Sequence, residues 1–458
     1  MKTHARISGV VSSGLLLAAG PAFAQHARLA GERDAARDPA PHPNHVLAAE
    51  GSAVEAVSSA PEPCGVVFGY LPYWANPSAI DYSRLTHLAC FSVEVDAAGN
   101  ISNPHGWPWT NTISTARANG VRVHLTVKNF SPTEIRSLML STAARQNLVT
   151  QLVPLIDPWA DGVNIDFEGS GSNGWPSFMP GFLAELRSGL EAALPRRTNP
   201  IEVSVATPAV NWGDAWPLGS VAQVSDHVFV MAYDFYGTWS STAGPTAPLT
   251  GGSINVTNTV DLEYAAVLAA EPEKLVLGLP LYGNTWTTNT SAVGAAALDY
   301  VGTPTFASAL SFYNANGVSF DPASQTTYRS YLVNGRTWRQ IWADDAGSLE
   351  RKVELARSRG LGGIGLWALG YESTGSPASA LWAMVDRSYV EPCLPCVADL
   401  DQTFPNAPRL TAEDVQLFLG LLGSADGSAD LAAPAGVLDA MDVAAFLEAL
   451  AAGCPTLP

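Results

Sequence analysis

Short runs of β-branched and other apolar residues recur eight times between residues 66 and 370. Runs of this kind are typical of β-strands, and several are separated by stretches with the period of an amphipathic helix. In one such stretch, residues 177–194, Phe178, Phe182, Leu186 and Leu190 share a helical face. The predicted strands cover residues 66–74, 85–95, 121–129, 162–168, 201–209, 227–234, 274–283 and 362–370.

This order of strands and helices predicts an α/β fold in which eight parallel strands close into a (β/α)₈ TIM barrel. A second helix is expected from a capping Ser348 to Gly360. The chain between the seventh strand and this helix is longer than an ordinary loop, so we expect a small α+β insertion before the last strand.

One predicted strand has a polar side, in the sequence DGVNIDFEG at residues 161–169. Because successive strand residues point to opposite faces, Asn164, Asp166 and Glu168 emerge together, while the residues between them are apolar. Active-site residues of a TIM barrel lie at the carboxyl ends of its strands. The polar side therefore predicts an active site at the end of the fourth strand.

Composition narrows the class of ligand. The chain has 458 residues, 47% of them apolar, 14% charged, and a formal net charge of −18. It contains no cluster of Lys and Arg that would neutralise phosphates, so nucleic acid is not an expected partner. After the N-terminal region no stretch offers about 18 consecutive uncharged apolar residues, so no membrane span is expected.

The N-terminus has the pattern of an export signal. Lys2, His4 and Arg6 precede a short apolar stretch that ends in Ala22-Phe23-Ala24. We therefore expect a signal peptide over residues 1–24 and a secreted protein, extracellular or at the cell surface. Residues 25–63, rich in Ala, Pro, His, Glu and Arg without an apolar period, are expected to form a disordered spacer.

The chain has five cysteines. Cys90 lies within an apolar run and is expected to be a buried free thiol. The other four flank apparent boundaries, and export permits disulfide formation. These positions favour pairing of Cys64 with Cys393 and of Cys396 with Cys454, although the sequence leaves the connectivity open.

Glu168 and Asp166 suggest glycoside hydrolysis. A Glu that donates a proton to a leaving oxygen at neutral pH needs a raised pKa, which burial and a neighbouring carboxylate both produce. Neighbours on one strand cannot easily bracket a glycosidic bond as acid and nucleophile. One solution is that the substrate supplies the nucleophile through its own 2-acetamido group, which Asp166 would orient.

Several motifs resemble those of glycoside hydrolase family 18, the chitinase-like barrels, over nearly all of residues 64–389. DGVNIDFE (161–168) resembles the family's fourth-strand signature, DGxDxDxE. The motifs similar to those of the first, sixth, seventh and eighth strands are GYLPYW (69–74), MAYD (231–234), GLPLYG (278–283) and GIGLWALG (363–370). Together and in this order, the motifs are far more specific than any one of them.

The resemblance implies a role for each site residue. Glu168 would be the general acid/base, Asp166 would hold the acetamido group and stabilise an oxazolinium intermediate, and Tyr233 would hydrogen-bond the acetamido carbonyl. Met231 and Asp234 would shape the same pocket. The other implied substrate-binding residues are Asn164, Trp367 as the floor, and Tyr70 and Tyr282 as walls. The resemblance implies no metal ion and no organic cofactor in the barrel.

Two positions depart from the family pattern. Asn164 stands where most members have Asp, and LTVKN (125–129) stands where typical chitinases have SxGG. Both resemble the branch that includes spore-cortex and cell-wall N-acetylglucosaminidases, which leaves chitin and peptidoglycan both open as the GlcNAc-containing polysaccharide. The alternative function is a lectin that binds such sugars without cutting them. Retention of Glu168 and Asp166 favours an enzyme.

The C-terminal region contains two similar segments, residues 398–422 and 429–450, each with Ala-Asp-Leu at its start and an amphipathic helix at its end. The order resembles dockerin-type duplicated calcium-loop modules, so residues 393–458 are expected to form a small helical domain. Ala432 and Pro434 stand where calcium ligands should be, which argues against strong calcium binding. A cohesin-binding dockerin and a helical hairpin that anchors the protein to another protein or a surface both remain open.

Overall fold

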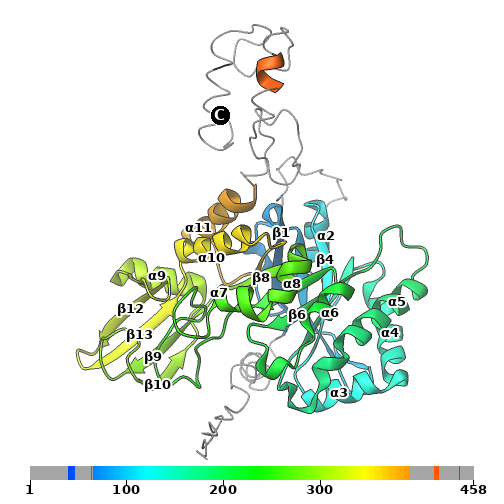
Figure 1. Ribbon diagram of the computed structural model, residues 1–458, viewed down its shortest axis with the longest axis horizontal. Helices are drawn as coiled ribbons and strands as arrows, with labels where there is room; N and C mark the ends of the chain where they lie inside the picture. The colour runs from blue at the N-terminus through cyan, green and yellow to red at the C-terminus, as the bar shows by residue number, and fades with distance from the viewer. Residues whose placement is uncertain (1–39, 47–62, 64, 391–416, 422–442, 444–458) are drawn as a thin grey trace, which may run out of the picture.

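The computed structural model describes residues 40–46, 63, 65–390, 417–421 and 443 (Figure 1). Eight parallel strands form a closed barrel in the order β1-β14-β8-β7-β6-β5-β4-β2, and β2 pairs with β1 to close it. The predicted TIM barrel is therefore confirmed. Its strands are β1 (Val66–Pro72), β2 (His87–Val95), β4 (Arg122–Asn129), β5 (Gly162–Phe167), β6 (Glu202–Pro208), β7 (His227–Met231), β8 (Leu275–Pro280) and β14 (Gly363–Trp367).

Helices connect successive strands, as a parallel barrel requires, and surround it in Figure 1. A short strand, β3 (Ile101–Asn103), extends β2 as an antiparallel hairpin. The helices around the barrel are α2 (Thr110–Ala118), α3 (Pro132–Leu140), α4 (Thr142–Ile156), α5 (Met179–Ala193), α6 (Leu218–Val224), α7 (Val256–Asn258), α8 (Ala265–Ala270), α10 (Ala346–Ser358) and α11 (Ser376–Val385).

Helix α5 covers the outer, apolar side of β5. Phe182, Leu186 and Leu190 are buried, as their spacing predicts, and the ring of Phe182 lies 5.6 Å from that of Phe167. Phe178 precedes the helix, in the 3₁₀ turn η5 (Trp175–Phe178), and packs against the core while partly exposed. Because the apolar side of β5 faces this helix, its polar side faces the barrel interior.

The start of α10 differs from the prediction. The capping residue is Asp345, not Ser348. The Asp345 carboxylate accepts a hydrogen bond from the Ser348 backbone N–H at 2.8 Å, and the Ser348 hydroxyl accepts one from the Asp345 N–H at 3.0 Å. Ser348 is thus the third helical residue of a capping box, a position that the sequence pattern of a single Ser does not distinguish from the cap itself.

The insertion before the last strand is confirmed. It forms a five-stranded antiparallel sheet in the order β10-β9-β13-β12-β11, at the left of the barrel in Figure 1. Helix α9 packs on it through Ala309 and Tyr313, which share a small apolar core with Ile341 and Ala343. The elements are β9 (Gly283–Thr288), β10 (Ala297–Gly302), α9 (Phe306–Asn316), β11 (Ser319–Asp321), β12 (Thr326–Val333) and β13 (Thr337–Ala343).

Part of the expected disordered spacer is ordered. Within residues 40–46, Pro43–His45 form the 3₁₀ turn η1, and His45 is fully buried. The His45 ring stacks on Trp109 at 4.4 Å, and its Nδ1 lies 2.9 Å from the Thr112 hydroxyl. These contacts hold the segment against α2 and explain the departure from the composition-based prediction.

Of the remaining expectations, the one for Cys90 can be checked, and the others fall on parts of the chain that the structure leaves undescribed. Cys90 is buried on β2 as a free cysteine, which confirms that prediction. The signal peptide, the limits of the barrel unit, the two disulfides and most of the C-terminal module lie outside the described residues; of that module, 417–421 and 443 are described, and both are helical. Among the helices described here, none has the length and apolar character needed to cross a membrane.

Candidate active site

Asn164 joins three barrel strands in the interior. It is fully buried on β5, level with Ser204 on β6. Its side-chain amide donates a hydrogen bond to the Ser204 hydroxyl at 3.0 Å, and its oxygen accepts one from the Tyr70 hydroxyl of β1 at 2.9 Å. The polar side of β5 therefore points inward, as the alternation predicts, and Asn164 is fixed on both sides.

The two predicted catalytic carboxyl groups lie above Asn164. Asp166 is level with Lys128 of β4 and is 2% exposed, and Glu168 is 1% exposed. Strand β5 ends at Phe167, one residue earlier than predicted. The Glu168 backbone N–H still donates to the Asn129 carbonyl at 3.0 Å, so the end of the neighbouring strand fixes the position of Glu168.

Two tyrosines, Tyr70 and Tyr233, lie close enough to these carboxyl groups to feel their charge. Burial raises the pKa of Tyr70 well above its usual value, and the negative charges of Asp166 and Glu168 raise it further. Burial likewise raises the pKa of Tyr233, followed by the influence of Tyr70 and of both carboxylates. Both tyrosines therefore keep their protons at neutral pH and can donate hydrogen bonds beside Asp166 and Glu168.

Tyr233 and Asp234 lie beyond the end of β7, which stops at Met231 rather than at the predicted residue 234. The backbone leaves the extended conformation there, and Asp234 has a left-handed φ of 58°. The Tyr282 hydroxyl donates to Asp234 Oδ1 at 2.5 Å, and burial, followed by the charge of Asp234, raises the pKa of Tyr282. The rings of Tyr233 and Tyr282 lie 6.1 Å apart.

Trp367, the last residue of β14, is 7% exposed. Its ring lies 5.5 Å from that of Tyr70 and 4.9 Å from that of Phe91, both edge-on. The predicted site residues thus come from β1, β5, β7, β8 and β14, or from the residues that follow them, and all are buried. They are Tyr70, Asn164, Asp166, Glu168, Met231, Tyr233, Asp234, Tyr282 and Trp367.

Two residues of the site were not predicted. Ser204 anchors Asn164, and alternation of Glu202 and Ser204 with apolar residues along β6 was a usable signal for it. Lys128 is 3% exposed, with its ammonium 3.3 Å from Glu94 Oε1 and 5.6 Å from the centre of the Phe91 ring. Lys128 thus places a cation on β4, level with Asp166. In the sequence, the only indication of its importance was that LTVKN differs from the family's usual third-strand motif.

Seven of the 13 tryptophans fall near the ends of loops between predicted elements, where some could stack on sugars. Five of the seven are buried, Trp107, Trp109, Trp175, Trp216 and Trp286, while Trp212 and Trp239 are partly exposed. Each of the five buried rings lies next to another aromatic ring, as Trp175 does with Trp216 at 5.1 Å. These contacts indicate structural roles for the five buried rings.

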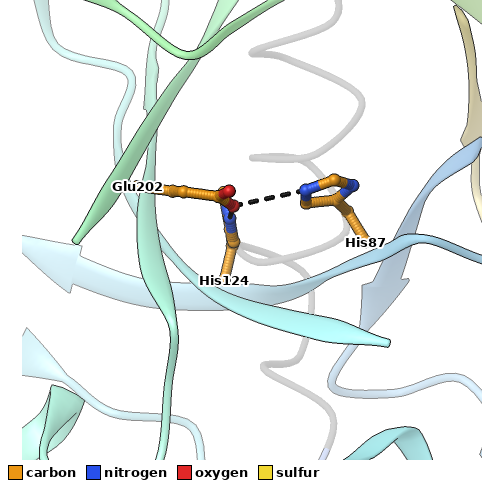
Figure 2. Close-up of side chains that lie close together, drawn as sticks. All are labelled: His87, His124 and Glu202. Carbon is orange, nitrogen blue, oxygen red and sulfur yellow. Dashed lines mark hydrogen bonds and ion pairs between the residues drawn. The ribbon is translucent and has the colours of Figure 1, made fainter. Parts of the chain in front are cut away.

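Within the described part of the chain, one group of His and acidic residues is spaced to hold a metal ion. It consists of His87, His124 and Glu202 (Figure 2). His87 and Glu202 are the first residues of β2 and β6, so this group lies at the amino end of the barrel, opposite Glu168. Ser204 lies between this group and the site described above, because its hydroxyl is 2.9 Å from His124 Nδ1 and 3.0 Å from the amide nitrogen of Asn164.

The fold and these residues together define a TIM barrel with buried carboxyl and hydroxyl groups gathered at the carboxyl ends of its strands. The family model for "Glycosyl hydrolases family 18" matches residues 66–372, about two thirds of the chain. The chain belongs to this family, in agreement with the resemblance of its strand motifs.

Known relatives agree with the family assignment. The chain is 29% identical over 269 residues to YdhD of Bacillus subtilis (strain 168), assigned by its name as a sporulation-specific glycosylase; the match covers 56% of this chain and 58% of YdhD. It is 26% identical over 299 residues to the cortical fragment-lytic enzyme of the same organism, covering 62% of this chain and 65% of that enzyme. The chain thus spans less than two thirds of the length of either curated relative.

Among solved structures, the family GH18 chitinase from Cycas revoluta in complex with allosamidin superimposes with a TM-score of 0.62 and 21% identity. The superposition covers 70% of this chain and 99% of the chitinase chain. At this level of identity the likeness establishes the barrel fold.

Proposed function

We propose that this chain is a secreted glycosidase that hydrolyses β-1,4 linkages next to N-acetylglucosamine by a substrate-assisted, retaining mechanism. The observation that carries the proposal is the placement of two buried carboxyl groups, Asp166 on β5 and Glu168 one residue beyond its end, where the Glu168 N–H still bonds to the neighbouring strand. Because they are two residues apart along the chain at the end of one strand, they lie side by side rather than on opposite faces of a sugar. A nucleophile from the substrate itself fits this arrangement.

In the first step, Glu168 donates its proton to the glycosidic oxygen as the bond from that oxygen to the anomeric carbon breaks. The carbonyl oxygen of the 2-acetamido group attacks the anomeric carbon and forms an oxazolinium ring. Asp166 accepts a hydrogen bond from the acetamido N–H and stabilises the positive charge of this ring. The proton that the mechanism needs on Glu168 is favoured by its burial and by the neighbouring Asp166.

In the second step, the Glu168 carboxylate takes a proton from water, and the water oxygen attacks the anomeric carbon from the side that the leaving group vacated. The oxazolinium ring opens, and the sugar keeps its configuration. Tyr233 donates to the acetamido oxygen and holds the group in place during both steps. Its raised pKa supports this role, because a protonated hydroxyl is required.

Asn164 supports Asp166 without adding charge. Its bonds to Tyr70 and Ser204 fix a neutral amide below Asp166, where most relatives would be expected to carry a second carboxyl group. The lectin alternative rests on this substitution, because one ionisable group of the family pattern is absent. The retained Glu168 and Asp166 favour hydrolysis.

We further propose that the substrate is a GlcNAc-containing polysaccharide, either chitin or peptidoglycan, and that the protein acts outside the cell. The names of the two Bacillus subtilis relatives support cell-wall material, whereas the structural relative from Cycas revoluta is a chitinase. The C-terminal module would bind a partner protein or a surface. Neither metal ion nor organic cofactor takes part in the proposed reaction.

The test is hydrolysis of fluorogenic N-acetyl-chitooligosaccharides and of purified peptidoglycan by the mature protein, compared with Glu168→Gln. Glu354→Gln, on an exposed position of α10, is the matched control. We expect Glu168→Gln to lose at least about 1000-fold in kcat with sugar binding retained, and the control to keep full activity. The preferred substrate decides between chitin and peptidoglycan. Saturable sugar binding without turnover in the wild type would identify a lectin instead.

A further inference from the structure

We propose that His87, His124 and Glu202 form a structural binding site for a divalent metal ion of the zinc class at the amino end of the barrel. Two imidazoles and one carboxylate are a donor set that Zn²⁺ accepts. The three residues begin or lie near the start of β2, β4 and β6, whereas Glu168 follows the end of β5. The proposed ion would therefore lie at the opposite end of the barrel from Glu168.

The spacing of the three ligand atoms fits one ion. His124 Nε2 lies 2.8 Å and His87 Nε2 lies 3.2 Å from Glu202 Oε2. The ligand atoms of the group all lie within 4.8 Å of one another. Ligands about 2.0–2.1 Å from a tetrahedral zinc ion stand about 3.3 Å apart. Figure 2 shows both rings with a nitrogen directed toward the carboxylate of Glu202.

His87 Nε2 is available to bind an ion through its lone pair. It is buried and close to the Glu202 carboxylate, yet it makes no hydrogen bond of acceptable geometry. The Nδ1 atoms of both histidines face hydroxyl groups, Thr86 at 2.8 Å from His87 and Ser204 at 2.9 Å from His124. Metal-bound histidines place their second nitrogen against such partners, which fixes the ring and leaves Nε2 for the ion.

Glu202 is oriented in the same way. Arg122 holds Glu202 Oε1 at 2.8 Å and so leaves Oε2 for the imidazoles. His227, the first residue of β7, is a further candidate ligand, because its ring centre lies 4.6 Å from that of His87. Its Nδ1 is buried and has no hydrogen-bond partner. A rotation of this ring, or a water molecule, would complete four-coordination.

A hydrogen-bonded cluster without metal is the competing explanation, with a proton on His124 Nε2 donated to Glu202. The two differ in a measurable way, because only the metal site binds one equivalent of Zn²⁺ and stabilises the fold on doing so. Such an ion would tie together three strands that are far apart in the sequence. Its removal would lower thermal stability without removing any group that the proposed hydrolysis uses.

The experiment uses the full-length protein after dialysis against a chelator. Binding of Zn²⁺ is measured by calorimetry, the coordination by the visible absorption of Co²⁺, and Tm by scanning calorimetry. His124→Asn retains a polar atom near Ser204 and removes Nε2, and Glu202→Gln removes only the charge. His42→Gln, outside the group, is the control. Circular dichroism and a cooperative unfolding transition in scanning calorimetry establish that each variant is folded.

We expect one equivalent of Zn²⁺ to bind to the wild type and to His42→Gln, with a tetrahedral Co²⁺ spectrum. At 100 times the dissociation constant, Tm should rise by roughly 5 °C. Both site variants should lose the bound ion and the rise in Tm while they remain folded. The proposal is overturned if the wild type binds no ion saturably, or if the folded variants bind it as tightly as the wild type.

Discussion

At the scale of single residues, Asn164 keeps the position one inward step below Asp166 electrically neutral. It is neutral, fully buried and bonded to Tyr70 and Ser204, so its position does not depend on ionisation. An Asp at the same place would accept the same hydrogen bond from Tyr70 and could accept one from Ser204. The change would add a carboxyl group one inward step below Asp166.

We therefore predict a shifted pH profile for Asn164→Asp. Added negative charge disfavours ionisation of neighbouring carboxyl groups, so it raises the pKa of Glu168. Because Glu168 must be protonated to act as an acid, the alkaline limb of kcat/KM should move to higher pH, by roughly half a unit to one unit. The measurement is the pH dependence of kcat/KM on a soluble chitooligosaccharide.

Ser204→Ala is the control for this prediction. It removes the other hydrogen-bond partner of Asn164 without changing its charge. An alkaline limb that stays in place in Asn164→Asp would show that residue 164 is not electrostatically coupled to the proton donor. The same shift in Ser204→Ala would assign the effect to loss of positioning.

How far single residues could be predicted depends on where their signal lies. Glu168, Asp166 and Asn164 share one strand, so alternation alone indicated that they face together. Ser204 and Lys128 act through neighbours on adjacent strands, and a contact between strands is set by sheet register, which local sequence does not encode. The group of His87, His124 and Glu202 was missed for the same reason, because its three residues come from three strands.

At the scale of elements, the strands were predictable because their apolar runs are long and β-branched. The ends of the strands were less predictable. Strand β7 stops at Met231, three residues before the predicted limit at Asp234, which takes a left-handed conformation. The chain leaves the sheet at such points to place Tyr233 and Asp234 in the site. The error in the helix cap at α10 has a similar origin, because Asp345 and Ser348 are both good capping residues.

The cap of α10 gives a prediction about stability. Asp345→Ala removes the carboxylate that accepts the Ser348 N–H, so the free energy of unfolding should fall by about 1 kcal/mol. Glu354→Ala, on an exposed position of the same helix, is the control and should change it by less than about 0.5 kcal/mol. The measurement is urea unfolding followed by circular dichroism. Equal effects of the two substitutions would contradict the role given to Asp345.

At the scale of the whole molecule, two buried titratable groups outside the active site act on stability in opposite directions. Burial raises the pKa of Glu372 to about 7. Burial, followed by the charge of His42, lowers the pKa of His45 to about 4. Glu372 follows the last barrel strand, and His45 belongs to the segment packed on α2. Both segments contact the barrel, so both groups report on its folded state.

The sign follows from proton binding. Between about pH 4.5 and 7 the folded chain holds a proton on Glu372 that the unfolded chain has lost, so this contribution to stability is lost as pH rises through 7. Between about pH 4 and 6.5 the unfolded chain holds a proton on His45 that the folded chain lacks. That contribution is present above pH 6.5 and is lost as pH falls toward 4. Over their shared range the two contributions cancel.

Single substitutions should remove this cancellation. With a chelator present, the Tm of Glu372→Gln relative to the wild type should rise as pH increases from 5 to 7.5, because the penalty of ionising Glu372 is absent. The Tm of His45→Gln relative to the wild type should fall as pH increases from 4 to 6.5. The wild type gains stability over this range because its unfolded state loses the proton on His45, whereas the variant has no imidazole there to titrate. In the double variant the two differences should offset each other between pH 4.5 and 6.5. Parallel Tm curves for all four proteins would show that neither group titrates differently in the folded chain, and the barrel would then owe its pH response to other residues.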